Sequence, residues 1–133
     1  MMKDALMSDT SHEFLNFRGL DTVSHAVSLP CPEGKPIVIN EVGEGFGVYL
    51  VFDLGCQEVG LLDLEIDASR GTEINIAHGE HLDDLRVRSA VGGRNFADSY
   101  ICKDGRQEWM MPFRRIGARY IEVHIPKLTG ELK

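Results

Sequence analysis

The chain has 133 residues, of which 43% are hydrophobic and 26% charged, a balance that predicts one globular domain. Fourteen Lys and Arg against twenty-one Asp and Glu give a net charge of -7, which disfavours a nucleic-acid surface and docking on anionic lipid. No apolar run approaches the ~20 residues of a membrane helix. The first thirty residues also lack the apolar stretch of a signal peptide, so a cytoplasmic address is the default expectation.

Cysteine usage points to reduced, mostly structural thiols. Cys31, Cys56 and Cys102 are odd in number and widely spaced. They offer neither a disulfide framework nor a C-x-x-C pair. Cys56 has no evident base that would make it a nucleophile, so a place in the core or in a bulge is the better interpretation.

Residues 1–35 come first in chain order and show little periodicity. We expect an irregular lead-in here that packs on the main body of the protein. A short helical turn near Phe14 to Phe17 is the one regular element expected in it.

From Pro36 onward the pattern is of strand after strand, with alternating or fully apolar runs. The expected strands are 36–40, 47–54, 59–67, 72–80, 96–102, 107–113 and 118–125. Gly, Asp and Pro residues separate them, which is typical of an antiparallel sandwich. We therefore predict an all-β, jelly-roll-like antiparallel β-sandwich over residues 36–133. Only residues 81–95 interrupt the pattern, as a loop of a length that is often functional.

The densest polar cluster is the segment HGEHLDD, which begins at His78. It suggests a cupin-like metal enzyme with His78, Glu80 and His81 as ligands, because His and Glu bind transition metals. A cupin pair needs histidines one residue apart, however, whereas His78 and His81 would face opposite sides of a strand. Asp83 and Asp84 could bind calcium, but adjacent loop aspartates are usually solvated. We therefore expect no metal and no cofactor.

Arg119 opens the last strong strand, among apolar neighbours. A strand-borne arginine is costly to bury unless it is paired, and its planar fork suits a carboxylate. We predict a structural ion pair between Arg119 and either Glu80 or Asp98.

Trp109 is the only tryptophan. Together with Tyr100 and Glu108 it could form a carbohydrate platform, in which an aromatic ring meets a sugar and a carboxylate holds its hydroxyls. The alternative, which we favour, is a core or interdomain anchor, the commoner role of a lone Trp beside methionines.

No motif in the chain identifies a catalytic centre. Glycosidases need two acids that flank the scissile bond, and Glu65 and Asp67 share a face, but on a polar face this indicates solvent exposure. There is neither a G-x-S-x-G elbow nor a phosphate-binding glycine loop followed by a helix.

Several segments taken in order resemble the β-sandwich domain of bacterial α-L-rhamnosidases. They are FDLG (52–55), EVG (58–60), GTEINIAHGE (71–80), an R-x-x-x-D-x-Y segment (Arg94, Asp98, Tyr100), an E-W-x-x-x-F hairpin (Glu108, Trp109, Phe113) and GARYIEV (117–123). The resemblance covers roughly residues 47–126, in order and at similar spacing, so it is more specific than any single motif. The loop lacks the glycine that often follows the aspartate pair, and RRI replaces an aromatic-glycine pair before the arginine.

The resemblance implies a concanavalin-like accessory domain that precedes a catalytic (α/α)₆ barrel and shapes its substrate entrance. Twelve helices of ~11 residues would need almost the whole length of this chain, so we expect the catalytic acids to lie elsewhere. A partner barrel in the same parent protein implies an exposed apolar patch, expected around Trp109, Met110, Met111 or the lead-in phenylalanines. The alternative is a binding module for rhamnose-like sugars, with Trp109 or Tyr100 exposed.

Overall fold

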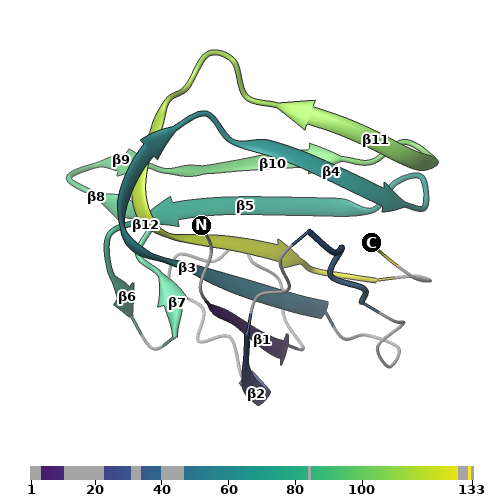
Figure 1. Ribbon diagram of the computed structural model, residues 1–133, viewed down its shortest axis with the longest axis horizontal. Helices are drawn as coiled ribbons and strands as arrows, with labels where there is room; N and C mark the ends of the chain where they lie inside the picture. The colour runs from purple at the N-terminus through teal and green to yellow at the C-terminus, as the bar shows by residue number, and fades with distance from the viewer. Residues whose placement is uncertain are drawn as a thin grey trace.

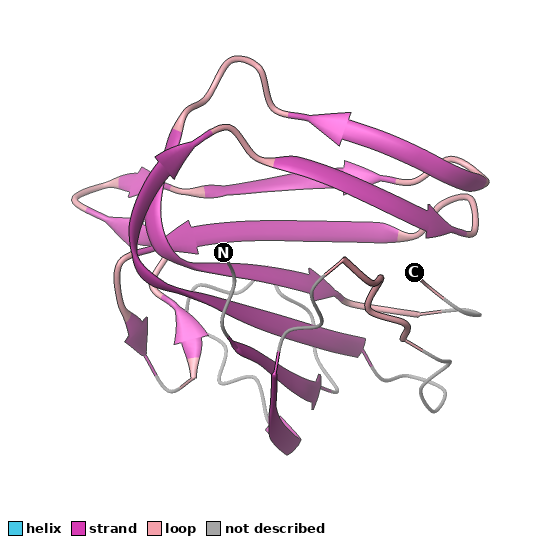
Figure 2. Cartoon of the chain, in the orientation of Figure 1, coloured by secondary structure: helices cyan, strands magenta, loops and turns pink. Residues whose placement is uncertain are grey.

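The computed structural model describes residues 4–10, 23–30, 34–39, 47–83, 85–128 and 132. They form two layers of antiparallel strands, with no helix among the described residues (Figure 1 and Figure 2). The larger layer has the strand order β10–β5–β12–β3–β1–β2. Its strands are β1 (Asp4–Thr10), β2 (Val23–Pro30), β3 (Gly47–Gly60), β5 (Glu73–Gly79), β10 (Ala97–Ile101) and β12 (Ile116–Ile125). The predicted all-β antiparallel sandwich is confirmed.

The second layer is the antiparallel pair of β4 (Asp63–Ala68) and β11 (Gly105–Met110), which lies over the larger sheet (Figure 1). On β4, Ile66 and Ala68 are buried while Glu65 and Asp67 are exposed, as strand alternation requires. The main core lies between the layers. Its buried members are Ile39, Val48, Leu50, Phe52, Ile66, Ala68, Ile74, Ile76, Cys102, Ile125, Leu128 and Leu132.

The outer face of the larger sheet is also partly covered. A short hairpin of β6 (Leu82–Asp83) and β7 (Arg86–Val87) brings Val87 against Tyr49 and Val51 of β3. This second cluster explains why the first half of β3 is apolar almost throughout: residues 47–52 are buried on both faces of the sheet.

A large irregular bulge interrupts the pairing of β3 with β12, and both strands bend there. Ala118 pairs with Glu58 and Tyr120 pairs with Asp53, so four residues of β3 face one residue of β12. Gly55 lies inside the bulge with φ 81°, a left-handed conformation that glycine adopts without steric cost. Beyond this corner both strands curve towards the second layer (Figure 1).

Two strands lie where the sequence pattern indicates an irregular lead-in. β1 pairs with β2 on one side and with β3 on the other, and this extends the larger sheet by two strands. The expectation of an irregular segment is therefore wrong for these two stretches, because their backbone groups find partners at the open edge of β3. The helical turn expected near Phe14 to Phe17 lies outside the described residues. The boundary at residue 35 stays a prediction.

Two further expectations differ from the structure. The segment 81–95 contains two small hairpins, β6–β7 and the pair of β8 (Ala90–Val91) and β9 (Arg94–Asn95), where an uninterrupted loop is expected. The strand expected at 36–40 is reduced, among its described residues, to one bridge between Ile39 and Leu132. In the part of the chain that the structure describes, no helix is long and apolar enough to cross a membrane.

Candidate functional site

The arginine predicted to form an ion pair does so, but with a different partner. Arg119 donates from Nε to Oδ1 of Asp53 and from Nη2 to Oδ2, both over 2.9 Å. The predicted partners Glu80 and Asp98 are therefore wrong. Asp98 lies on β10, two strands away from β12, whereas Asp53 lies on the adjacent β3 beside the corner. The carboxylate of Asp53 raises the pKa of the Arg119 guanidinium above its usual value.

The two carboxylates predicted for Arg119 are engaged elsewhere. Asp98 accepts a hydrogen bond from Nη1 of Arg114 over 2.9 Å, and Arg114 also donates from Nη2 to the Asn95 carbonyl. Glu80 accepts from Nε2 of Gln57 over 2.7 Å. Glu80, which directly follows the end of β5 at Gly79, is therefore engaged as a hydrogen-bond acceptor.

The residues of the predicted carbohydrate platform separate onto two faces. Trp109 faces inwards and packs against the main core, with its ring 5.4 Å from the Tyr100 ring. Tyr100 in turn donates its hydroxyl hydrogen to Gln107 over 2.8 Å. Glu108 is exposed on the opposite face of β11, because successive side chains of a strand alternate. The geometry brings Trp109 and Tyr100 together but leaves Glu108 apart from them.

Four large apolar side chains near one end of the second layer remain exposed. They are Val59, Leu61, Met110 and Phe113, with exposed fractions of 61%, 52%, 51% and 95%. Their segments run side by side, because Gly117 pairs with Val59 and the Met111 N–H donates to the Leu62 carbonyl over 3.2 Å. We call these four side chains the Phe113 patch. Several exposed apolar side chains on neighbouring segments are a candidate interaction site.

A polar pocket of about 520 Å³ lies at the end of β5, close to the Phe113 patch. Its polar and aromatic lining consists of His78, Glu80, His81, Arg88, Phe96, Arg114 and Arg115. Burial, reinforced by the charge of Arg114, lowers the pKa of His78, so its ring is neutral at pH 7. We call this space the His78 pocket. The segment 81–95, for which a functional role is expected, supplies His81 and Arg88 to it.

A buried ion pair on the outer face of the larger sheet escapes prediction from the sequence. Glu122 accepts hydrogen bonds from Nη2 of Arg86 over 2.6 Å and from the Val87 N–H over 2.8 Å. Arg86 also lies over the Tyr49 ring, 4.6 Å from its centroid. The sequence signal for such a pair is the acidic Glu122 between apolar residues of the last strand, because a carboxylate buried there needs a hydrogen-bond donor. Its partner, in a polar segment, carries no such signal.

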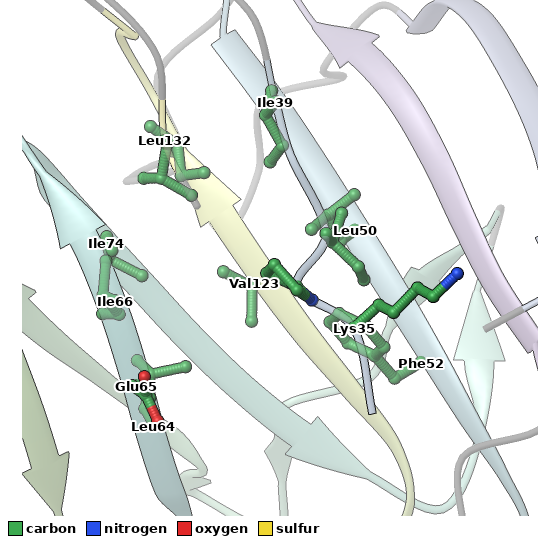
Figure 3. Close-up of a pocket in the computed structure, with 13 residues that line it drawn as sticks. Lys35, Ile39, Leu50, Phe52, Leu64, Glu65, Ile66, Ile74, Val123 and Leu132 are labelled. Atoms are coloured by element: carbon green, nitrogen blue, oxygen red, sulfur yellow. The ribbon is translucent and has the colours of Figure 1, made fainter. Parts of the chain in front are cut away.

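The gap between the layers is apolar and belongs to the core. It measures about 240 Å³, and Leu50, Phe52 and Val123 point into it from β3 and β12 (Figure 3). Lys35 and Glu65 also line it. A second layer of two strands covers six strands incompletely, which accounts for the opening.

The cysteines and the metal candidates offer no catalytic centre in the described part of the chain. Cys56 lies exposed in the bulge and Cys102 is buried, where burial raises the pKa of its thiol. Among the described residues, no group of three or more His, Cys, Asp and Glu side chains could hold a metal ion. Asp83 accepts hydrogen bonds from Arg88. Cys31 and Asp84 lie outside the described residues.

Comparison with known proteins identifies relatives of this fold. Residues 47–131 match the bacterial alpha-L-rhamnosidase concanavalin-like domain. The crystal structure of the GH78 family rhamnosidase of Bacillus sp. GL1 is 25% identical with a TM-score of 0.65, and the match covers 84% of this chain and 12% of that one. The α-L-rhamnosidase from Dictyoglumus thermophilum is 21% identical with a TM-score of 0.49, and the match covers 73% and 12%. No curated protein sequence matches the chain.

The match agrees with the segments that carry the resemblance. The matched range contains every described strand from β3 to β12, and it spans well over half of the chain. This chain in turn spans only 12% of the length of the two rhamnosidases. The chain belongs to the family of bacterial α-L-rhamnosidase concanavalin-like domains.

Proposed function

We propose that this chain is a non-catalytic β-sandwich domain of an α-L-rhamnosidase-like glycoside hydrolase. In this role it packs against a catalytic (α/α)₆ barrel of the same parent protein and supports it. The Phe113 patch is the observation that carries the proposal. A Phe side chain that is 95% exposed, near segments that carry three other half-exposed apolar side chains, is costly in water and favourable in an interface.

The length of the relatives supports an occupant from the same parent protein. The Bacillus sp. GL1 rhamnosidase has most of its chain outside the region that matches this domain. Interfaces between domains of one chain bury roughly 600–1,500 Å², and exposed apolar side chains are suited to such a contact. Of the residues expected to form it, Met110 is a member, whereas Trp109 and Met111 are half-buried.

The arrangement of carboxylates supports a non-catalytic role. Glycoside hydrolysis uses two carboxyl groups on either side of the scissile bond. Glu80 is the one acidic side chain among the described residues that line the His78 pocket. Asp53, Asp98 and Glu122 are engaged by arginines. We therefore expect this chain alone to leave 4-nitrophenyl α-L-rhamnoside intact.

The test is association with the catalytic region. The reading frame downstream of Lys133 is expected to encode a helical barrel, and the purified barrel region is expected to bind this chain in analytical ultracentrifugation. Phe113→Asp should weaken that association by at least about tenfold, because it places a charge at the centre of the interface.

Ile101→Asp is the matched control, because Ile101 is 58% exposed on β10 outside the Phe113 patch. It should leave the association unchanged. Rhamnoside hydrolysis by the chain alone, or an association that Phe113→Asp does not weaken, would contradict the proposal.

A further inference from the structure

Backbone hydrogen bonds connect the segments that line the His78 pocket. The His78 N–H donates to the Phe96 carbonyl over 3.0 Å, the Arg88 N–H to the His81 carbonyl over 3.0 Å, and the Phe96 N–H to the Ser89 carbonyl over 2.8 Å. The first bond joins the end of β5 to the residue that follows β9, and the other two close the β6–β7 and β8–β9 hairpins at their bases. The pocket is therefore preformed, and its volume of about 520 Å³ falls within the range of small-molecule sites.

The β6–β7 hairpin also approaches β5 very closely. A Cβ atom added to Gly79 would lie 2.7 Å from the carbonyl oxygen of Arg88 and 3.0 Å from Cγ1 of Val87. Only glycine fits here without movement of a neighbour. This close approach holds the segment that carries Arg88 against the end of β5, beside His78.

Most of the positive charge around the pocket is already neutralised. Arg88 donates from Nε to Asp83 over 2.6 Å, and Arg114 donates from Nη1 to Asp98 over 2.9 Å. Arg115 is exposed and has no hydrogen-bond or ion-pair partner among the described residues. The charges without an ion-pair partner among the described residues are therefore the Arg115 guanidinium and the carboxylate of Glu80, whose Oε1 accepts from Gln57.

The floor of the pocket is neutral and partly aromatic. His78 is 6% exposed, and its Nε2 has no hydrogen-bond partner in the part of the chain that the structure describes. It packs against the Phe96 ring, with centroids 5.5 Å apart, and Arg114 lies 6.0 Å from the centroid of the same ring. A ligand here meets an apolar ring below and polar groups around it.

We propose that the His78 pocket binds a neutral sugar ring. A hydroxyl group both donates and accepts hydrogen bonds, so adjacent hydroxyls can satisfy the donors of Arg115 and the acceptor oxygens of Glu80 together. An anion would face Glu80, and a cation would face Arg115. The C–H face of a sugar ring would cover Phe96.

The pocket adjoins the surface proposed for docking. Arg114 and Arg115 directly follow Phe113, so a domain seated on the Phe113 patch would lie beside a sugar held in the pocket. Sugar binding does not depend on that docked domain. Titrations of the isolated chain therefore test it separately from the association experiment.

The experiment is calorimetric titration of the 133-residue chain with four probes: D-glucose, L-rhamnose, D-galacturonate and inorganic phosphate. We expect at least one of the neutral sugars to bind saturably with a millimolar Kd, and the two anions to bind more weakly. Arg115→Leu and Glu80→Leu should each weaken binding by about tenfold, because each removes hydrogen bonds to a charged group. Both residues are exposed, so the unfolding temperature should stay unchanged.

Arg70→Leu is the matched control, since Arg70 is an exposed arginine in the turn at the opposite end of β5. It should leave sugar binding unchanged. Absence of saturable binding, binding of the anions alone, or sugar binding that neither pocket variant weakens would each overturn the proposal.

Discussion

Replacement of Glu122 by alanine tests what holds the outer face of the larger sheet together. The Glu122 side chain is 1% exposed, and its carboxylate accepts hydrogen bonds from Nε (2.9 Å) and Nη2 (2.6 Å) of Arg86 and from the Val87 N–H (2.8 Å). The variant removes these contacts at once. It removes the Glu122 carboxylate from beside the Arg86 guanidinium, which is 19% exposed and lies above the Tyr49 ring.

The expected loss of stability follows from this burial. Breaking a buried ion pair by removal of one partner costs about 3–5 kcal/mol. Because Arg86 keeps some contact with water, we expect the lower end, about 3 kcal/mol. At about 4 °C per kcal/mol for a chain of this size, the unfolding midpoint should fall by about 12 °C. Urea unfolding followed by the fluorescence of Trp109 measures the free energy of unfolding directly.

A double variant and a control make the test specific. Glu122→Leu combined with Arg86→Met removes both charges and should recover most of the loss, because a buried pair often contributes little beyond apolar packing. Glu65→Ala breaks the exposed pair of Glu65 with Arg106 and should cost no more than about 1 kcal/mol. A loss below about 1 kcal/mol for Glu122→Ala, or a double variant no more stable than Glu122→Ala, would refute the reasoning.

Three further predictions concern pH, the corner and the hairpins. Burial, and secondarily the neighbouring guanidinium, lowers the pKa of His124 to about 3, so the unfolded chain takes up a proton below pH 6.5 that the folded chain does not. Stability should therefore fall by about 2 kcal/mol from pH 7 to pH 5 in urea titrations, and His124→Gln should remove that part of the slope, leaving the part due to His78. Arg119→Lys should lower the unfolding midpoint in calorimetry, because an ammonium cannot reproduce the two-point contact at the corner; an unchanged midpoint would contradict this. Gly79→Ala should cost about 1–3 kcal/mol in urea unfolding, since its Cβ would meet the backbone of the hairpin, whereas Gly60→Ala, in open space and without a positive φ, is the control and should cost less.

The strands of the second half of the chain could be predicted because their pattern reflects burial. Ile121, Val123 and Ile125 alternate with polar residues and face the main core, as expected. The segment expected as one strand at 59–67 contains a break, because β3 ends at Gly60 and β4 begins at Asp63. Hydrophobic alternation indicates which face is buried, but it does not show where a strand leaves one sheet for another.

The strands of the lead-in carry a weaker signal. In β2, Val23, Val27 and Leu29 recur at even spacing, but His25 and the flanking proline-rich stretch interrupt the pattern. These segments form strands because the edge of β3 offers unpaired backbone groups with which a nearby segment can pair. Such pairing depends on the backbone more than on side-chain type, so periodicity alone does not reveal it.

The sequence predicts which type of side chain pairs with a charged residue, but not which residue supplies it. The need of Arg119 for a carboxylate follows from its position in an apolar strand, and such a partner is present. The choice among Glu80, Asp98 and Asp53 depends on which strands are neighbours, and this is a property of the topology. The same reasoning applies to Glu122, whose partner lies 36 residues earlier in the chain.

The corner explains why two separated segments together indicate this fold better than either one alone. Asp53 of FDLG accepts hydrogen bonds from the Gly55 N–H over 2.8 Å and from Arg119 of GARY, 66 residues later. The glycine permits the positive φ, the aspartate closes the turn, and the arginine clamps the aspartate from the neighbouring strand. The three groups thus form one hydrogen-bonded unit at the corner, although the side chains of Arg119 and Asp53 keep contact with water. A chain that carries both segments in order can therefore bend its two central strands at one point, and that bend brings β4 and β11 over the core.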